Sequence, residues 1–543
     1  MAAKQKKSTG LKAQNEALRS MNKVRGWMSQ TAMVFVLAIL LVHPLFVDST
    51  GYYAITEAKQ SFFRFCAILF FSVVFLFSIT APGLYRRFSW KALIRGIRSY
   101  EWPLIALVLV MTVSTIFAGS TKIALHGVSG RNEGLLMMLL YFGVCVLVGR
   151  LYKPKEWIFY VLCIAAALVA CYGVFQYYGM DFLGLYPAEE GTQTGSAFVY
   201  FATMSNRNVA STYFCVAFCI SLVMFCQKSK NAHWAFLPLG LILFYALLIG
   251  QTESGYVGLV VSVALMFPFI ASTRQAAARF FLMIAGCLGM MWIETTTGLA
   301  SSAFSSYWVF LRPFLVPGAA ALLLVAAAFF FIKLPSLPAK VLRIGWYVLL
   351  LIMIVSFVGF LPQLAAATGN ASFTQLADIL HGNLDDSFMS GRMMVWKRAL
   401  SMVPERLLFG YGPDNFSHSF NAVHYDAVYA AQGQFYDKLH NEYLQILFDN
   451  GMLGLLSMLG FYSALLFAAR KKLVNPMVLA LTVALLCHMA QAFFNFVSPF
   501  AHPVVWTLWG VLGATLYERP GGAEKGTRTV GLTERGSGIR NLS

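Results

Sequence analysis

Charge is scarce in this sequence. Charged residues make up only 12% of the 543 positions, about half of the roughly one quarter that soluble globular domains carry. Hydrophobic residues make up 58%, and they fall in runs long enough to cross a bilayer, which takes about 20 residues of helix. This composition excludes a soluble protein and predicts an all-α polytopic membrane protein.

We expect about fourteen transmembrane helices, with one large polar segment before the last three. The predicted spans cover about 27–47, 61–85, 100–118, 134–151, 156–177, 208–227, 233–251, 254–271, 276–293, 308–332, 341–362, 442–469, 474–494 and 501–517. The expected organisation is a basic mobile tail at 1–26, spans with short outer loops at 27–362, a large ordered loop at 363–441, the remaining spans at 442–517 and a disordered tail at 518–543.

The net charge of +18 does not by itself indicate nucleic-acid binding, because the basic residues are unevenly distributed. With the N-terminus placed in the cytoplasm, most Lys and Arg fall on the cytoplasmic side and most Asp and Glu on the outer side. This is the positive-inside pattern of membrane proteins. It predicts that both termini are cytoplasmic and that the large loop is extracytoplasmic.

Several catalytic signatures are missing. The sequence has no GxxxxGK[ST] loop, no dinucleotide fingerprint and no HExxH, which removes support for ATP-driven transport and redox chemistry. All nine cysteines fall within predicted spans, so no disulfide framework is indicated. Cys215 and Cys219 lie one helical turn apart, but no nearby His or Asp suggests a metal site with them. We expect neither a metal nor a cofactor.

The stretch from Ser390 to Gly454 is the most distinctive part of the chain. Met389–Leu407 has the apolar spacing of an amphipathic helix that could lie at the membrane interface, and Pro404 is expected to kink or end it. Gly410–Pro413 has the composition of a turn. His440 lies at the start of the next helix, and Asp449–Gly451 is expected to interrupt that helix.

Arginine recurs on separate outer loops. Arg131, Arg207 and Arg392 each lie at the outer membrane boundary in the predicted topology, and the carboxylate of Glu253 could pair with Arg131 or Arg207. Guanidinium groups bind phosphate through bidentate bonds, and a near-neutral imidazole such as His440 can accept a proton from a hydroxyl. These residues would suit transfer of a sugar from a lipid diphosphate. Simpler roles remain open, since Arg131 could form a surface pair with Glu133, and His440 could cap or pack its helix.

The long motif order also resembles that of a known family. The matching residues are Ser390-Gly391-Arg392 with Trp396, Gly410-Tyr-Gly-Pro-Asp-Asn-Phe416, His440-Asn-Glu-Tyr-Leu444 and Gly451 with Gly454, and weaker matches are Arg131-Asn-Glu-Gly134 and Asn206-Arg-Asn208. Together they resemble the O-antigen ligase and O-antigen polymerase family. One departure is that Thr252-Glu-Ser-Gly255 has no arginine after the serine, where family members commonly carry one. Either Arg207 or Arg131 supplies that charge, or donor binding differs, or activity is lost.

The resemblance implies a glycosyltransferase C-like architecture in the bacterial cytoplasmic (inner) membrane. It implies metal-independent, inverting transfer of a glycan from undecaprenyl diphosphate at the extracytoplasmic face. Arg392 would contact the diphosphate, His440 would activate the acceptor, and Trp396 and Asn441 lie in the matching motifs as further substrate-binding candidates. The acceptor could be a lipid-anchored sugar, another repeat unit, a wall polymer or a protein hydroxyl.

Two other classes of function are open to a chain of this composition. A lipid-linked oligosaccharide flippase or other transporter would carry charges within its spans, facing a cavity, and Asp449 and His488 are the nearest candidates. A non-catalytic scaffold would not need His440 and Arg392 in this arrangement. The clustering of charge at one face favours an enzyme.

Overall fold

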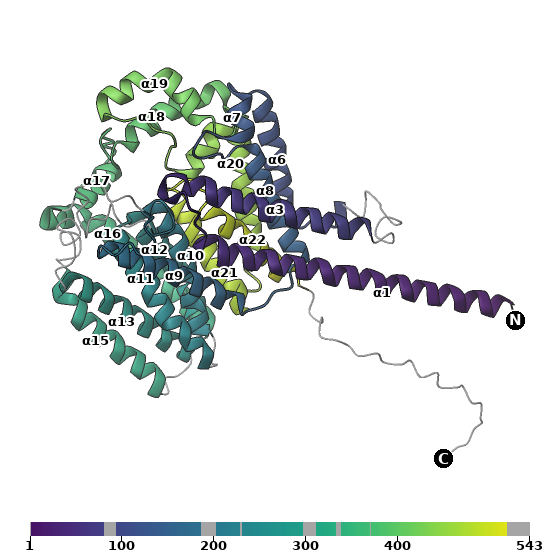
Figure 1. Ribbon diagram of the computed structural model, residues 1–543. Coiled ribbons are helices and arrows are strands. Elements are labelled where there is room, and N and C mark those ends of the chain that lie inside the picture. Colours follow the sequence, from purple (N-terminus) through teal and green to yellow (C-terminus); the bar gives the residue numbers. More distant parts are fainter. Residues whose placement is uncertain are drawn as a thin grey trace, which may run out of the picture.

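The computed structural model describes residues 2–80, 94–185, 202–227, 231–296, 311–332, 338–369 and 371–518. Within these ranges all regular structure is helical (Figure 1). Most of the predicted outer loop at 181–208, part of the predicted inner turn at 333–343 and nearly all of the predicted C-terminal tail lie outside the described residues.

Ten described helical segments are long and apolar enough to cross a membrane. They are Arg19–Leu45 (the end of α1, a π-turn and α2), α3 (Ile55–Ile79), α9 (Ile158–Tyr177), α10 (Arg207–Gln227), Asn231–Gly250 (a 3-10 turn and α11, Phe236–Gly250), α12 (Glu253–Ile270), α13 (Arg274–Thr296), α15 (Arg312–Phe331), α16 (Ala339–Thr368) and α20 (Glu442–Ala469). The chain is therefore an all-α polytopic membrane protein, as its composition predicts.

Four further predicted spans coincide with shorter helices: α6 (Glu101–Ile116), α8 (Leu135–Leu151), α21 (Pro476–Gln491) and α22 (His502–Tyr517). Each of the fourteen predicted spans thus has a helix, but these four have only 16 or 17 residues. The number of spans stays a prediction.

Helix α10 lies at the centre of the bundle. Every residue from Val209 to Cys226 is buried, because α9, α11, α12, α13 and α21 pack around it. By contrast, α15 and α16 leave most of their apolar side chains exposed. An apolar helix surface exposed in this way is suited to hydrocarbon rather than water.

The N-terminal segment is helical. Helix α1 spans Ala2–Leu37 and so begins far upstream of the predicted span, while the mobility and the cytoplasmic side of the basic tail at 1–26 stay predictions. The segment is rich in Ala, Lys, Gln and Leu, which are strong helix formers, so the helix can extend into a polar region.

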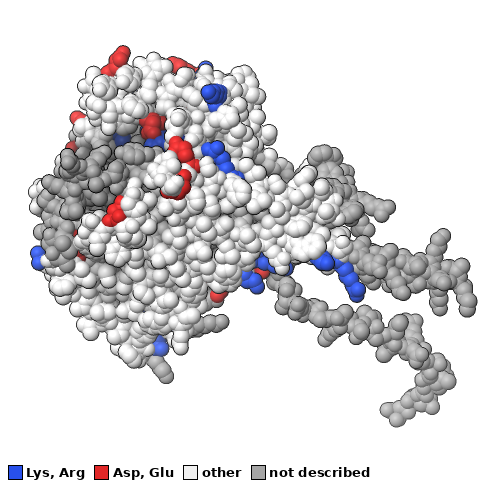
Figure 2. All heavy atoms as spheres, viewed as in Figure 1, with Lys and Arg blue, Asp and Glu red and all other residues white. Residues whose placement is uncertain are grey.

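A helical cap covers one end of the bundle. We use this name for residues 388–441, which hold α18 (Arg392–Met402), a 3-10 turn at Val403–Arg406 and α19 (Phe416–Gln432). The short helix α17 (Ala371–Leu380) precedes it (Figure 1). The cap has its own apolar cluster, which includes Trp396, Phe416, Phe420 and Leu439 and extends to Phe448 of α20. Figure 2 shows charged residues at the cap and at its base, above a wide band with little charge.

The amphipathic pattern of Met389–Leu407 is largely confirmed. Regular α-helix ends at Met402, and Pro404 lies in the 3-10 turn that follows. Of the predicted apolar residues, Met393, Met394, Trp396 and Val403 are buried, whereas Leu400 is 45% exposed. The apolar face of α18 packs inside the cap.

The cap and α20 are joined by backbone hydrogen bonds. Tyr411 N–H donates to the carbonyl of Phe448 at 3.0 Å, and Met452 N–H donates to that of Leu407 at 2.7 Å. Helix α20 breaks at Gly451, which has φ +68° and ψ −173°, a conformation that is open to glycine and closed to most residues. The predicted interruption at Asp449–Gly451 is therefore confirmed, and the break frees backbone groups to hold the cap.

Candidate functional site

The short segment before α20 carries His440 and is held in a fixed conformation. The carbonyl of Leu439 accepts the Trp396 indole N–H at 2.7 Å, and Leu439 N–H donates to Gln445 Oε1 at 2.9 Å. On the other side, Glu442 N–H donates to the carbonyl of Ala492 at 2.7 Å. His440 itself has φ +52°, an uncommon value outside glycine. Because Leu439 and Glu442 on either side are held by these hydrogen bonds, His440 can keep this backbone conformation.

The His440 ring is half-buried between aromatic side chains. Its centroid lies 5.0 Å from that of Phe496 and 6.5 Å from that of Tyr436, and both contacts are edge-on. Burial and the nearby Arg392 charge lower the pKa of His440 to about 4, although Asp437 opposes the shift. The imidazole is therefore neutral near pH 7, the form that can accept a proton.

Arg131 reaches the same place from a different part of the chain. It lies in the loop between α7 (Thr121–His126) and α8, and its Nε donates to Asp437 Oδ2 at 2.8 Å. Its guanidinium lies over Phe496, with the central carbon 4.9 Å from the ring centroid. The side chain of Arg131 is 30% exposed, so the cation is oriented but accessible.

The sequence suggested Glu133 or Glu253 as the ion-pair partner of Arg131, but the structure pairs Arg131 with Asp437. Glu133 is buried and accepts a hydrogen bond from the hydroxyl of Tyr141 at 3.2 Å. Burial alone would raise the pKa of Asp437, but Arg131 and Lys438 hold it below its ordinary value. The pair is therefore ionised at neutral pH.

Arg392, Glu253 and Arg207 form the other side of the site. Arg392 begins α18, and its Nη1 donates to the carbonyl of Phe494 at 3.2 Å. Glu253 begins α12 and Arg207 begins α10. The Glu253 carboxylate acts electrostatically on both arginines. Arg207 is one of the two partners expected for Glu253, and Arg392 is an additional one.

Trp396 and Asn441 have local structural roles. The Trp396 indole is buried and donates to the backbone beside His440. Asn441 is buried and caps α20, because its side-chain oxygen accepts Leu444 N–H at 3.1 Å. Both residues therefore support the histidine segment from within the protein.

The sequence-based reasoning did not single out Asp437, Lys438 or Phe496. Asp437 and Lys438 precede the motif that contains His440. Two adjacent charged residues are unusual in a chain with so little charge, and this could have marked them as candidate site residues. Phe496 carried no signal, because it lies among many apolar residues near the end of α21. Only the folded structure shows that its ring contacts both Arg131 and His440.

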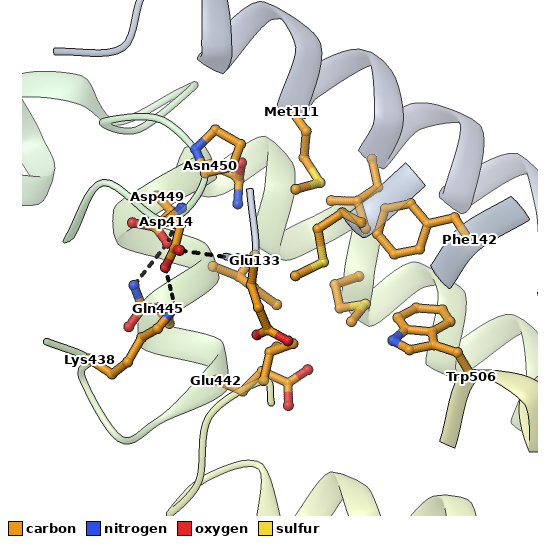
Figure 3. A pocket seen from close by; sticks show the side chains of 16 residues that line it. Met111, Glu133, Phe142, Asp414, Lys438, Glu442, Gln445, Asp449, Asn450 and Trp506 are labelled. Carbon is orange, nitrogen blue, oxygen red and sulfur yellow. Dashed lines mark hydrogen bonds and ion pairs between the residues drawn. The ribbon is translucent and has the colours of Figure 1, made fainter. Parts of the chain in front are cut away.

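Beneath the histidine segment lies a cavity of about 60 Å³. Its polar lining includes Glu133, Asp414, Lys438, Glu442 and Asp449, and its apolar side includes Met111, Phe142 and Trp506 (Figure 3). Burial raises the pKa of Glu133 to about 7, although Lys438 opposes the shift. Asp414, Glu133 and Asp449 together hold the pKa of Lys438 above its ordinary value, against the effect of burial.

One group of described residues has the spacing of metal ligands. Ligand atoms of Glu442, His488 and His502 lie within 4.8 Å of one another, and all three residues are buried. The Ser498 N–H, however, donates to His502 Nδ1 at 3.0 Å. The proton of a neutral His502 ring must then lie on Nε2, the atom that faces Glu442 at 3.6 Å. A metal would need the lone pair of this nitrogen, so the hydrogen bond from Ser498 argues against a metal at this group.

Comparison with known proteins locates the family signal in the same region. Residues 314–459 match the family model Wzy_C, described as O-antigen ligase. The matched residues run from α15 into α20 and include Arg392, Trp396, His440 and Asn441, whereas Arg131, Arg207 and Glu253 lie outside them. No curated protein matches the chain.

The match supports a glycosyltransferase-type enzyme that acts on lipid-linked glycans at a membrane. It agrees with the resemblance carried by the motifs between Ser390 and Gly454. The match at residues 314–459 thus supports the assignment of this multi-pass membrane protein to the O-antigen ligase and polymerase family.

Proposed function

We propose that this protein transfers a glycan from undecaprenyl diphosphate to an acceptor hydroxyl. The reaction takes place at the outer face of the bacterial cytoplasmic membrane, with the cap outside and both termini in the cytoplasm. It inverts the anomeric centre and needs no metal. Charge supports this orientation, because most basic residues fall on the side opposite the cap in the predicted topology.

The observation that carries the proposal is the meeting of a neutral imidazole with arginines from separate segments. His440 and Arg131 both contact Phe496, and the charges of Arg131 and Arg392 both act on the histidine. A base and several anion-binding groups at one partly open place are what transfer from a diphosphate requires. A flippase would not need a base held among phosphate-binding cations.

The residues act as follows. The acceptor oxygen attacks the anomeric carbon while its proton passes to the free ring nitrogen of His440. The bond from that carbon to the diphosphate oxygen breaks, and its electron pair leaves with undecaprenyl diphosphate. Arg392 and Arg131 bind the diphosphate and stabilise the charge that develops on it. Attack opposite the leaving group inverts the configuration.

Arg207 takes the role of the arginine that is missing after Ser254. It begins α10, and Glu253 acts on it and on Arg392 alike. An arginine that reaches the region of Glu253 from α10 can supply a similar charge to one placed on α12. Glu253 then offsets part of the positive charge of the two arginines until the diphosphate replaces it.

The test uses purified protein in lipid with lipid-linked glycans and candidate acceptors. Release of undecaprenyl diphosphate is followed for the wild type, His440→Ala and Arg392→Ala. We expect release that requires an acceptor and is lost in both variants, and the required acceptor distinguishes a ligase from a polymerase. Passage of unchanged labelled lipid across the bilayer, with no release on any acceptor, would instead establish a transporter.

A further inference from the structure

We propose that Asp414 is a positioning residue that fixes the Arg131 loop and the His440 segment relative to each other. The two segments are residues 127–134 and 437–442. The inference rests on the proposed function only for the importance of their spacing, because the contacts themselves are independent of the reaction. Asp414 lies in the turn before α19 and is 4% exposed.

One carboxylate oxygen of Asp414 holds the arginine loop at both ends. Its Oδ2 accepts the Val128 N–H at 2.8 Å and the Glu133 N–H at 3.4 Å. These amides flank Arg131 in the chain, so their common acceptor closes the loop that presents the guanidinium.

The other oxygen holds the histidine segment. Asp414 Oδ1 forms an ion pair with the Lys438 ammonium, and both groups are almost fully buried (Figure 3). Lys438 lies two residues before His440. A buried ion pair loses much of its stability when either partner is removed, since the other charge is left uncompensated. The pair therefore fixes where the histidine segment begins.

A chain of hydrogen bonds connects this contact to the other end of the segment. Asp414 N–H donates to Asp449 Oδ2 at 3.2 Å, and Gln445 Nε2 donates to the same oxygen at 2.8 Å. Gln445 Oε1 in turn accepts Leu439 N–H at 2.9 Å. The network leaves Lys438 and returns to its neighbour Leu439. It fixes the position of the segment within the cap.

The residue type suits this position. Asp414 has φ +57°, which Asp and Asn adopt more readily than most residues. Asn would keep one acceptor oxygen, which can still serve either the two N–H donors or the ammonium. Gly also adopts a positive φ and removes both oxygens, so Asp414→Gly removes the linkage while this backbone conformation stays accessible.

The experiment compares Asp414→Gly with Lys438→Met by hydrogen–deuterium exchange of the full-length protein in lipid. Asp414→Gly should raise exchange in both 127–134 and 437–442, by about tenfold for a lost hydrogen bond. Lys438→Met leaves the amides of Val128 and Glu133 bonded, and should raise exchange only in 437–442. Because this readout needs no turnover, it holds even if the proposed reaction is wrong.

The double variant Asp414→Gly with Lys438→Met guards against misfolding, since it leaves no unpaired buried ammonium. It should stay folded and still exchange faster than the wild type in both segments. Where turnover is measurable, Asp414→Gly should lower kcat by about tenfold or more with a smaller change in KM, because misplaced catalytic groups slow the chemical step. Faster exchange in only one segment, or in neither, would overturn the proposal.

Discussion

Arg131 and His440 lie against the same aromatic ring although they come from distant parts of the chain. The Arg131 guanidinium carbon is 4.9 Å from the centroid of Phe496, and the His440 ring centroid is 5.0 Å from it. Phe496 thus contacts both a permanent cation and a titratable ring. The nearby cation opposes protonation of the ring, and this relationship makes the site sensitive to changes in charge.

Replacing His440 by Asn should remove the base while preserving the backbone. Asn tolerates the positive φ of this position better than Ala, so the segment should keep its conformation. We expect the rate of acceptor-dependent release to fall by about 10²–10⁴-fold, the usual contribution of general base catalysis. Binding of undecaprenyl diphosphate, measured separately, should remain. A variant that kept a rate within about tenfold of the wild type would exclude His440 as the base.

The acidic limb of the pH–rate profile should move in opposite directions in two variants that each remove one charge near His440. Activity requires neutral His440, whose pKa is about 4, so the rate falls as pH decreases through the value of the free enzyme. Arg392→Gln removes a positive charge, which should raise that pKa and move the acidic limb to higher pH. Asp437→Asn removes a negative charge and should move the limb to lower pH.

The measurement is kcat/KM between about pH 3 and pH 7, since this ratio reports the free enzyme. The position of the limb is compared rather than the maximal rate, because Arg392→Gln also weakens donor binding. Shifts of the same sign in both variants would show that the limb belongs to another group.

Glu253 should compete with the diphosphate for the arginines. Glu253→Gln removes a carboxylate that acts on Arg207 and Arg392. Because Glu253 is exposed, its interactions are screened, and about 1 kcal/mol or less is expected. Product inhibition by undecaprenyl diphosphate should therefore become up to about fivefold stronger. Weaker inhibition would instead mean that Glu253 orients the arginines for binding.

Two glycines with the same backbone angle should differ in their tolerance of alanine. Gly451 has φ +68°, and a Cβ there would overlap the backbone of Leu408, while Gly433 has φ +66° with nothing close to its Cβ position. Gly433→Ala should cost about 1–2 kcal/mol for the backbone strain alone. Gly451→Ala should cost about 3 kcal/mol or more, because strain and overlap add. Unfolding in detergent measures both, and equal costs would contradict a close contact at Gly451.

Metal chelation should leave the protein unaffected. His502 accepts Ser498 N–H at Nδ1, which leaves its Nε2 protonated toward Glu442. Purified protein should therefore contain no stoichiometric zinc, and a chelator should change neither its melting temperature nor its activity. If one zinc ion per chain were found, and His488→Ala removed it, the hydrogen-bond interpretation would be wrong.

The sequence predicted the features that depend on local pattern. Apolar runs marked every described helix that is long and apolar enough to cross a membrane, but not the polar start of α1 or α19. The order of the motifs marked Arg392 and His440. The glycine at position 451 predicted a break in α20, because glycine adopts backbone conformations that other residues rarely adopt. These signals come from residues close together in the chain, where composition and spacing have direct structural meaning.

The missed features depend on contacts between distant segments. Arg131 pairs with Asp437 and Asp414 pairs with Lys438, and nothing near Arg131 in the sequence specifies these partners. Glu133 was the nearer candidate for Arg131, but it is buried. Phe496 resembled any other apolar residue. Only the packing of α8, α20 and the cap brings these groups together.

The break at Gly451 also bears on how this protein could be recombined with its relatives. The last turn of α20 before the break is bonded to the segment Leu407–Gly412, through the carbonyls of Phe448 and Asp449. A graft of the cap that stopped at the start of α20 would separate these partners and leave buried backbone groups unmatched. A piece that keeps the backbone bonds between the cap and α20 runs through Leu453, whose N–H donates to the carbonyl of Leu408. Chimaeras that exchange the cap should therefore be cut inside α20, beyond its glycine.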